Sequence, residues 1–214
     1  MRIAVLGGTF NPIHYGHLRV AEEVSEGLGL DRVLFIPAFV PPHKPEEKIT
    51  SAPARLEMTR LATVDNPAFE ASDIEIRREG RSFTVETLRE LRKDKGEGLS
   101  IDLIMGNDSF NDITTWCEYE ELIRLAGFIV VPRPGYPLKK IAEVLPVELA
   151  RKFWYDPDTG SYLNSFGTGV RYFDATRLEI SSSDIRERVR EGLSVRYLMP
   201  GAVIEYIREK GLYM

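Results

Sequence analysis

The stretch from Ile3 to His17 reads IAVLGGTFNPIHYGH. Its first four residues are apolar without interruption and stop at Gly7 and Gly8, a pattern typical of a strand buried on both faces of a parallel sheet. From Tyr15 to Leu28, apolar side chains then recur at helical spacing with charged residues between them, which predicts an amphipathic helix. A buried strand, a glycine turn and a helix make up the repeating unit of a doubly wound sheet.

The same alternation continues along the chain. The sequence predicts further strands at 33–36, 74–76, 101–105, 128–131 and 170–173. It predicts further helices that begin at 51–53 with a serine cap, cover 85–91, 118–125 and 146–153, and include two amphipathic helices near 185–189 and 203–207. Otherwise the region 134–176 is less regular and is expected to form a long loop. The predicted fold is α/β, a doubly wound and mostly parallel sheet in one domain, 1–214, with 180–214 as a small C-terminal helical part.

Composition narrows the class of protein. Hydrophobic residues make up 43% of the 214 positions, enough for a sizeable core. Lysine and arginine number 28 against 33 aspartates and glutamates, and the resulting net charge of −5 argues against a nucleic-acid-coating protein. No apolar run approaches the roughly 18 residues of a membrane span. The one cysteine, Cys117, cannot form an internal disulfide, so we expect a cytoplasmic protein without nucleic-acid or membrane partners.

The turn after the first strand has the features of an anion site. Gly7 and Gly8 permit close approach of the backbone to a ligand. The turn ends where a helix is expected to begin, and the free N–H groups of a helix N-terminus favour phosphate. His14 and His17 add two imidazole donors at the same place.

Two other segments carry suitable donors. His43 and Lys44 follow the second predicted strand, so all three histidines follow strand ends expected at one edge of the sheet. Three serines at 181–183 precede a predicted helix that carries Arg186, whose planar guanidinium can bind phosphate oxygens bidentately. Together the three segments predict a site that holds phosphate groups.

Less specific interpretations stay open at this point. The glycine turn lacks the G-x-G-x-x-G spacing of dinucleotide sites, and the chain has no Gly-Lys pair for a Walker loop. His14 and His17 could ligate a metal, although no cysteine or carboxylate stands at matching spacing, or they could be structural histidines. The serine run could be an ordinary helix cap followed by a solvated Arg186.

Residues 7–17 resemble the signature of the nucleotidylyltransferase superfamily, a His or Thr followed after two spacers by a second His, and 180–186 resemble its second phosphate motif. Further segments resemble the bacterial nicotinate-nucleotide adenylyltransferase family, and only about 140–169 is not distinctive. These segments are 37–44, 54–58, 82–88, 106–109, 115–116, 130–136 and 193–198.

This resemblance implies a Rossmann-like nucleotidylyltransferase fold and transfer of the adenylyl group of ATP to nicotinate mononucleotide, in NAD biosynthesis. The residues it implies for catalysis are His17 as principal transition-state donor, with His14, Lys44 and Arg186. Those implied for ATP binding are Gly8, Thr9, Phe10, His14, His17, Ile180, Ser182 and Arg186. Those implied for mononucleotide binding are His43, Lys44, Thr84, Asp108, Trp116, Cys117 and Arg133, with Trp116 stacked on the nicotinate ring. Mg²⁺ is expected to arrive with ATP, without a protein metal site, and a homo-oligomer is left open.

The chain departs from the family pattern at two positions. Many members carry Asp where this chain has Asn11, and Ala where it has Asn107. The sequence also leaves other functions open. A sister enzyme could act on nicotinamide mononucleotide, phosphopantetheine, or a sugar or glycerol phosphate. A non-catalytic nucleotide sensor could retain the fold, although His14, His17, Lys44 and Arg186 are intact. A tRNA synthetase fragment would need a tRNA-binding module, which the sequence does not show.

Overall fold

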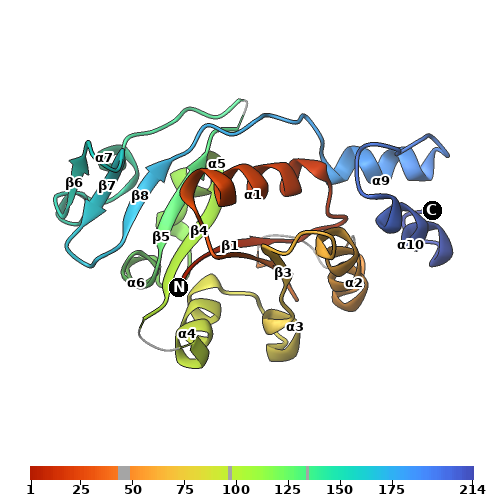
Figure 1. Ribbon diagram of the computed structural model, residues 1–214, viewed down its shortest axis with the longest axis horizontal. Helices are drawn as coiled ribbons and strands as arrows, with labels where there is room; N and C mark the ends of the chain where they lie inside the picture. The colour runs from red at the N-terminus through yellow and green to blue at the C-terminus, as the bar shows by residue number, and fades with distance from the viewer. Residues whose placement is uncertain (43–48, 96–97, 134) are drawn as a thin grey trace. The chain divides into compact units, whose positions relative to one another are not determined.

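The computed structural model of the chain describes residues 1–42, 49–95, 98–133 and 135–214 (Figure 1). The chain forms two compact units. The first unit comprises Met1–Leu6 and Phe83–Ala175, and the second unit comprises Gly7–Ser82 and Thr176–Met214. The described residues hold eight strands of a mostly parallel sheet with flanking helices, which is the predicted fold class.

The strands of the first unit follow the order β1-β4-β5-β8-β7-β6 (Figure 1). The first four are parallel neighbours, whereas β7 and β6 are antiparallel additions next to β8. The strands β1, β4 and β5 are mostly apolar and buried because both of their faces are covered, whereas β8 buries only Val170. The bounds are β1 Arg2–Gly8, β4 Ser100–Gly106, β5 Gly127–Val131, β8 Gly169–Tyr172, β7 Ser161–Asn164 and β6 Phe153–Asp156.

The helices of the first unit include one long amphipathic helix, α4 (Thr84–Lys95), which packs against α6 (Tyr119–Leu125). Its buried side chains Val85, Leu88 and Leu91 recur every three residues and so lie on one face. The other helical segments are short. They are α5 Asn107–Asn111, the 3₁₀ turn η2 Ile113–Thr115, α7 Ile141–Val144 and α8 Val147–Ala150.

The second unit is built around β2 (Arg32–Pro37), whose four central residues are almost completely buried. It pairs in parallel with β3 (Phe69–Ala71), and the rings of Phe35 and Phe69 lie 4.9 Å apart between their centroids. Helix α10 packs against α2. The helices are α1 Tyr15–Leu28, α2 Ala52–Thr63, α3 Ile74–Arg78, α9 Ser182–Arg190 and α10 Gly201–Glu209.

The predicted strand at 74–76 is wrong, because these residues form helix α3. The alternation of Ile74 and Ile76 suggested a strand, but Ile74 is buried whereas Ile76 is only half-buried. A helical turn forms instead, in which Arg77 N–H donates to the Asp73 carbonyl at 2.8 Å and the Arg77 side chain to the Asp73 carboxylate. The strand of this region, β3, lies a few residues earlier.

The region 146–164 also differs from the prediction. The helix predicted over 146–153 is confined to α8, because Phe153 already begins β6. The expected long loop contains the antiparallel pair β6 and β7, joined by a turn in which Gly160 adopts φ +63°. A Pro-Asp-Thr-Gly sequence is a strong turn signal, so this hairpin could have been predicted.

The other predicted helices and strands are confirmed within a few residues. Ser51 stands at the N-cap of α2, although its side chain makes no capping hydrogen bond. In the part of the chain that the structure describes, no helix is both long enough and apolar enough to cross a membrane.

Candidate active site

The two histidines of the first turn form one structural element in the second unit. His14 is the N-cap of α1 and His17 is its third helical residue, so both side chains lie on the same side of the first turn. Their rings overlap at 3.7 Å between centroids and 31° between planes. The His14 backbone N–H donates to Nδ1 of His17 at 3.3 Å. Because a neutral imidazole has one acceptor and one donor nitrogen, this bond places the proton of His17 on Nε2.

Two glycines make room for this arrangement. A Cβ on Gly8 would lie 3.0 Å from the ring of Phe10, and a Cβ on Gly16 would lie 3.0 Å from the ring of His14. Phe10 is buried, adopts φ +46° and presents its ring edge-on to His17, with 5.0 Å between centroids. The orientation of both imidazoles therefore depends on the absence of side chains at two positions.

The N-terminus of α9 contacts the same turn. Ser181 is the N-cap, and its hydroxyl accepts a hydrogen bond from Asp184 N–H at 3.1 Å, as the sequence predicts. The Ser182 hydroxyl donates to the Pro12 carbonyl at 2.8 Å, and the Arg186 guanidinium donates to the Asn11 carbonyl at 2.8 Å. Two segments about 170 residues apart in the sequence thus meet.

Arg55 is an organising residue that the sequence analysis missed. Its side chain is almost completely buried and donates to three backbone carbonyls, those of Thr9 at 2.7 Å, Phe39 at 3.0 Å and Thr50 at 2.8 Å. Burial lowers the pKa of Arg55 to about 10, so the group is still charged at neutral pH. One guanidinium therefore fixes the first turn and two other segments.

Asn11 and Tyr213 make a second long-range connection. The Asn11 side-chain oxygen accepts hydrogen bonds from the Tyr213 hydroxyl at 2.8 Å and from Thr50 N–H at 3.3 Å. Burial raises the pKa of Tyr213 to about 12, so its hydroxyl is a donor at neutral pH. An aspartate, the residue common in the family at this position, has the same acceptor oxygen. The Asn11 departure therefore preserves this contact.

Not every predicted phosphate-binding residue can be placed. His43 and Lys44 lie outside the described residues. Ile180 is half-buried directly before the α9 cap, and Thr9 is half-buried with its carbonyl bonded to Arg55. The structure does bring together the others in the second unit, which are Gly8, Phe10, His14, His17, Ser182 and Arg186.

Asp108 and Arg133 meet in the first unit. They follow the adjacent strands β4 and β5, and an Arg133 nitrogen lies 2.9 Å from an Asp108 oxygen. A Cβ on Gly106 would clash with the other oxygen, Oδ1, so the carboxylate keeps this position because residue 106 has no side chain. Asp108 Oδ1 is buried and has no hydrogen-bond partner within the described ranges. This oxygen is a hydrogen-bond acceptor that the described residues leave unused.

Asn107 holds the segment that carries Arg133. Its buried side chain accepts a hydrogen bond from Arg133 N–H at 2.7 Å and donates to the carbonyls of Tyr136 at 2.9 Å and Pro137 at 3.2 Å. Alanine could make none of these bonds. The second departure from the family pattern thus adds three contacts behind the predicted mononucleotide site.

Trp116 and Cys117 lie between η2 and α6 in the first unit. Trp116 is half-buried and Cys117 is exposed. Thr84 is the first residue of α4, and Arg89 of the same helix bonds the carboxylates of Glu118, at 2.6 Å, and Glu121. The hydrogen bond from Arg89 lowers the pKa of Glu121. These ion pairs join α4 to the segment that follows Cys117.

No group of three or more histidine, cysteine or acidic side chains that could hold a metal ion occurs within the described residues. If His14 and His17 held a metal ion, the described residues would therefore supply no third ligand of these types beside them.

Comparison with known proteins places the chain among enzymes of one family. The model of the cytidylyltransferase-like family matches residues 5–188. Two curated relatives are named probable nicotinate-nucleotide adenylyltransferase, one from Citrifermentans bemidjiense and one from Geobacter sp. strain M21. Each is 50% identical over 214 residues, which cover 100% of this chain and 99% of the relative. The chain belongs to the nicotinate-nucleotide adenylyltransferase family.

Solved structures confirm the predicted Rossmann-like nucleotidylyltransferase fold. A Plasmodium falciparum nicotinic acid mononucleotide adenylyltransferase complexed with NaAD superposes with a TM-score of 0.71, at 20% identity, over 99% of this chain and 97% of that one. The Plasmodium falciparum protein complexed with APC gives a TM-score of 0.67, at 20% identity, over 99% of this chain and 96% of that one. The curated relatives confirm the predicted family, and they confirm that the chain is a nucleotidyltransferase.

Proposed function

We propose that this chain transfers the adenylyl group of ATP to nicotinate mononucleotide and releases pyrophosphate. The observation that carries this proposal is that the N-terminus of α9 bonds to the Asn11 and Pro12 carbonyls of the turn that leads into the His14–His17 pair, within the second unit. The curated relatives carry the name of this activity. The names favour nicotinate mononucleotide over the acceptors of sister enzymes.

The proposed triphosphate site consists of donors and helix ends. Both α1 and α9 begin there, and a helix N-terminus attracts phosphate through its dipole and its unbonded N–H groups. Of the first-turn N–H groups, Tyr15 N–H is bonded to the Leu198 carbonyl and Asp184 N–H to the Ser181 hydroxyl, so the dipoles and the remaining N–H groups carry this attraction. The Nε2 of His17 adds an imidazole donor and Arg186 adds a charged, planar one. Gly8, Thr9, Phe10 and Ile180 would line the nucleotide, and Lys44 with His43 would approach the reacting phosphates.

The reaction needs positioning and charge stabilisation rather than a base. The second pKa of a phosphate monoester is about 6, so the attacking phosphate is largely dianionic at neutral pH. One of its oxygens bonds to the α-phosphorus of ATP. The bond from that phosphorus to the bridging oxygen breaks, and its electron pair leaves with pyrophosphate. Donors fixed in advance, such as His17, stabilise the charge that develops in this step.

Mg²⁺ is proposed to enter the site as part of the ATP substrate. Magnesium ions are commonly held by substrate phosphates with few protein carboxylates. When bound to the triphosphate, the ion neutralises part of its negative charge. The side chains proposed to grip the phosphates are His14, His17, Ser182 and Arg186, whose hydrogen-bond donors suit them to phosphate oxygens. The Ser182 hydroxyl has one hydrogen, which it donates to the Pro12 carbonyl, so it would exchange that carbonyl for a phosphate oxygen.

The mononucleotide is proposed to bind to residues of the first unit. Asp108 and Arg133, which form an ion pair at 2.9 Å, are proposed to contact the mononucleotide together. The Asp108 Oδ1 has no partner within the described residues and is buried, so a ligand hydroxyl would bond to it only after the carboxylate turns. Trp116 is only half-buried, so part of its ring is accessible for stacking on the nicotinate ring. Backbone N–H groups near Thr84 and Cys117 are proposed to bind the nicotinate carboxylate.

Replacing Trp116 by alanine is expected to weaken nicotinate mononucleotide binding by about tenfold or more, since ring stacking and apolar burial are both lost. The affinity for ATP should change less than twofold. Calorimetric titration with each substrate measures both effects. Trp154→Ala, an exposed tryptophan on β6 of the same unit, is the matched control. Unchanged mononucleotide affinity would remove Trp116 from the binding site.

Replacing Asn107 by alanine is expected to raise KM for nicotinate mononucleotide by about three- to tenfold, because three hydrogen bonds behind Arg133 are lost. Alanine is common there in the family, so kcat and the KM for ATP should stay within about twofold. Steady-state kinetics measures these constants. Asn111→Ala, which loses one bond to Pro137, is the control. A loss confined to kcat would contradict the positioning role.

One assay tests the proposed function. Pyrophosphate release is followed with ATP plus nicotinate mononucleotide, nicotinamide mononucleotide or phosphopantetheine. We expect the highest kcat/KM with nicotinate mononucleotide and formation of nicotinate adenine dinucleotide. Preference for another acceptor would assign the chain to a sister activity, and no turnover with any acceptor would favour a nucleotide sensor.

A further inference from the structure

A cavity of about 720 Å³ lies in the first unit at the amino ends of its parallel strands. Its lining includes the first residues of β1, β4, β5 and β8. Asp108 and Arg133 lie beyond the carboxyl ends of β4 and β5, and the seven residues of β4 span roughly 20 Å. The cavity is therefore separate from the proposed mononucleotide residues.

The hollow arises from glycines in one row of the sheet. Asp102 of β4 is paired with Gly127 of β5, and the pairing of Phe128 with Val170 puts Gly169 of β8 next to Gly127. Two neighbouring strands thus lack a side chain at this level. A Cβ on Gly127 would lie 2.2 Å from the Asp102 carboxylate, and a Cβ on Gly169 would lie 2.5 Å from the Tyr162 carbonyl.

The walls of this hollow are cationic. Four arginines and one aspartate line it, which gives these residues a net charge of +3 in a chain whose net charge is −5. The ionisable lining residues are Arg2, Arg92, Arg124, Arg171 and Asp102. The hydroxyls of Ser100, Ser161 and Thr168 add further hydrogen-bonding groups.

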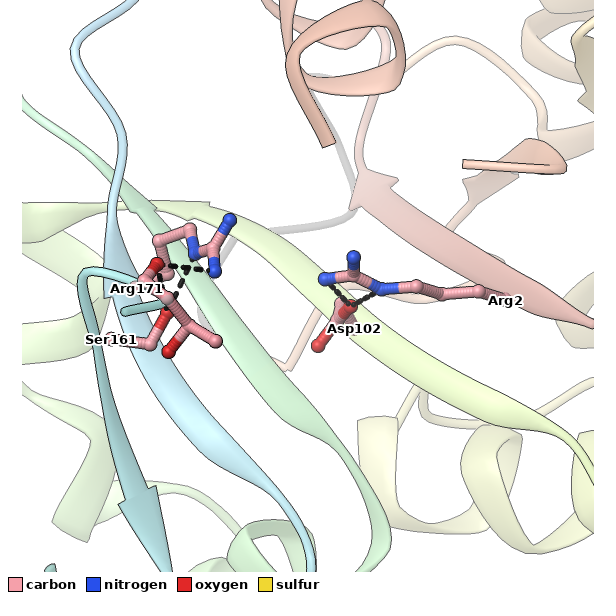
Figure 2. Close-up of polar contacts among 5 residues, drawn as sticks. Arg2, Asp102, Ser161 and Arg171 are labelled. Atoms are coloured by element: carbon pink, nitrogen blue, oxygen red, sulfur yellow. Dashed lines mark hydrogen bonds and ion pairs between the residues drawn. The ribbon is translucent and has the colours of Figure 1, made fainter. Parts of the chain in front are cut away.

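The arginines are held in place in two different ways (Figure 2). Arg2 donates twice to one oxygen of Asp102, at 3.1 and 3.0 Å, so its charge is compensated. Arg171 donates to the Ser161 hydroxyl and the Thr159 carbonyl, both at 2.6 Å. Figure 2 shows the guanidinium groups of Arg2 and Arg171 on the same side of the sheet, as expected from strand positions two residues from the glycine row.

Arg92 resembles Arg171 in its contacts. Its guanidinium donates to the Leu125 carbonyl at the end of α6, with one distance of 3.0 Å. The acceptors bonded to Arg92 and Arg171 are neutral oxygens, which orient a guanidinium without cancelling its charge. Arg124 lies over the Phe166 ring at 5.3 Å, which also leaves its charge in place.

We propose that this cavity binds a small polyanion that carries phosphate or carboxylate groups. Oriented guanidinium groups bind both kinds of group bidentately, and the volume lies in the range of small-molecule sites, roughly 300–1,000 Å³. Arg171 and Arg92 are the main binding groups. Asp102 opposes binding through its charge, while it also orients Arg2.

Calorimetric titration of the full chain with tripolyphosphate and, separately, with citrate tests this inference and distinguishes the two chemical classes. Arg171→Met, which keeps the aliphatic stem, should weaken binding by about tenfold or more, and Arg171→Lys by less. Asp102→Asn should tighten binding by about threefold, a gain that a misfolded variant could not produce. Arg151→Met, an exposed arginine of the same unit outside the cavity, should change nothing.

Arg186→Met separates this site from the proposed ATP site. If the cavity inference holds, this variant should leave anion binding at the cavity within twofold of the native value. It should weaken ATP binding whether or not the cavity inference holds. The inference is overturned if neither anion binds, if Arg186→Met abolishes binding while Arg171→Met does not, or if Asp102→Asn fails to tighten it. Pyrophosphate release with nicotinate mononucleotide then reports on the proposed function independently.

Discussion

His17→Ala is expected to lower kcat by about a hundred- to a thousandfold, the usual cost of losing one preorganised transition-state donor. ATP affinity should fall at least tenfold less than kcat does, because the donor is expected to bind the developing charge more tightly than the ground-state triphosphate. The structure gives the physical reason, since His17 Nδ1 accepts the His14 N–H and its proton is on Nε2. Steady-state kinetics and calorimetry with a non-hydrolysable ATP analogue measure the two quantities.

Arg19→Ala is the matched control for this prediction. Arg19 is an exposed residue of the same helix and pairs with Glu23, away from the ring pair. Its replacement should leave kcat within about twofold of the native value. Near-native turnover of His17→Ala, or a loss of ATP affinity as large as the loss of kcat, would show that His17 does not act in the transition state.

Arg55→Met is expected to lower the free energy of unfolding by about 3–5 kcal/mol. The variant keeps the apolar stem but leaves three carbonyls without their buried donor, and each such loss costs about 1–3 kcal/mol. Arg55→Lys should be nearly as destabilised, because one ammonium cannot reproduce a planar group bonded to Thr9, Phe39 and Thr50. Urea unfolding followed by circular dichroism measures the change.

Arg60→Met serves as the control, since Arg60 lies on the same helix, its side chain is half-exposed, and its ion pairs with Glu57 and Asp73 are long, at 3.8 and 3.9 Å. It should change the free energy of unfolding by less than about 1 kcal/mol. If Arg55→Met were no more destabilised than this control, the three carbonyl contacts would not hold the first turn. At temperatures where Arg55→Met stays folded, its KM for ATP should still rise.

The parts of the fold that the sequence predicts well are those with strong local patterns. The apolar run before Gly7 and the helical spacing after Tyr15 each appear within a few residues, and β1 and α1 follow them closely. Local patterns fail where they are short. Ile74 and Ile76 alternate as a strand does, yet three residues cannot distinguish a strand from the single turn of helix that forms there.

The site shows the same division between local and long-range features. His14, His17, Ser182 and Arg186 are predicted site residues because each stands in a short motif, and the structure places these motifs at the N-termini of α1 and α9. The Tyr213–Asn11 hydrogen bond joins residues 202 positions apart, so no local pattern could predict it.

Arg55 differs from Tyr213, because a local pattern in the sequence could have pointed to it. It stands one turn after Ala52 on the buried face of α2, where an arginine among apolar residues could have marked it as a buried donor. The contacts of Asn107 were not visible from sequence either, since they involve the backbone of a loop after the neighbouring strand.

A crystal structure with a non-hydrolysable ATP analogue tests the central claim most directly. We predict that the triphosphate lies at the N-termini of α1 and α9, with the His17 Nε2 and the Arg186 guanidinium within hydrogen-bonding distance of its oxygens. A triphosphate bound elsewhere in the chain, or one that contacts neither His17 nor Arg186, would contradict this prediction.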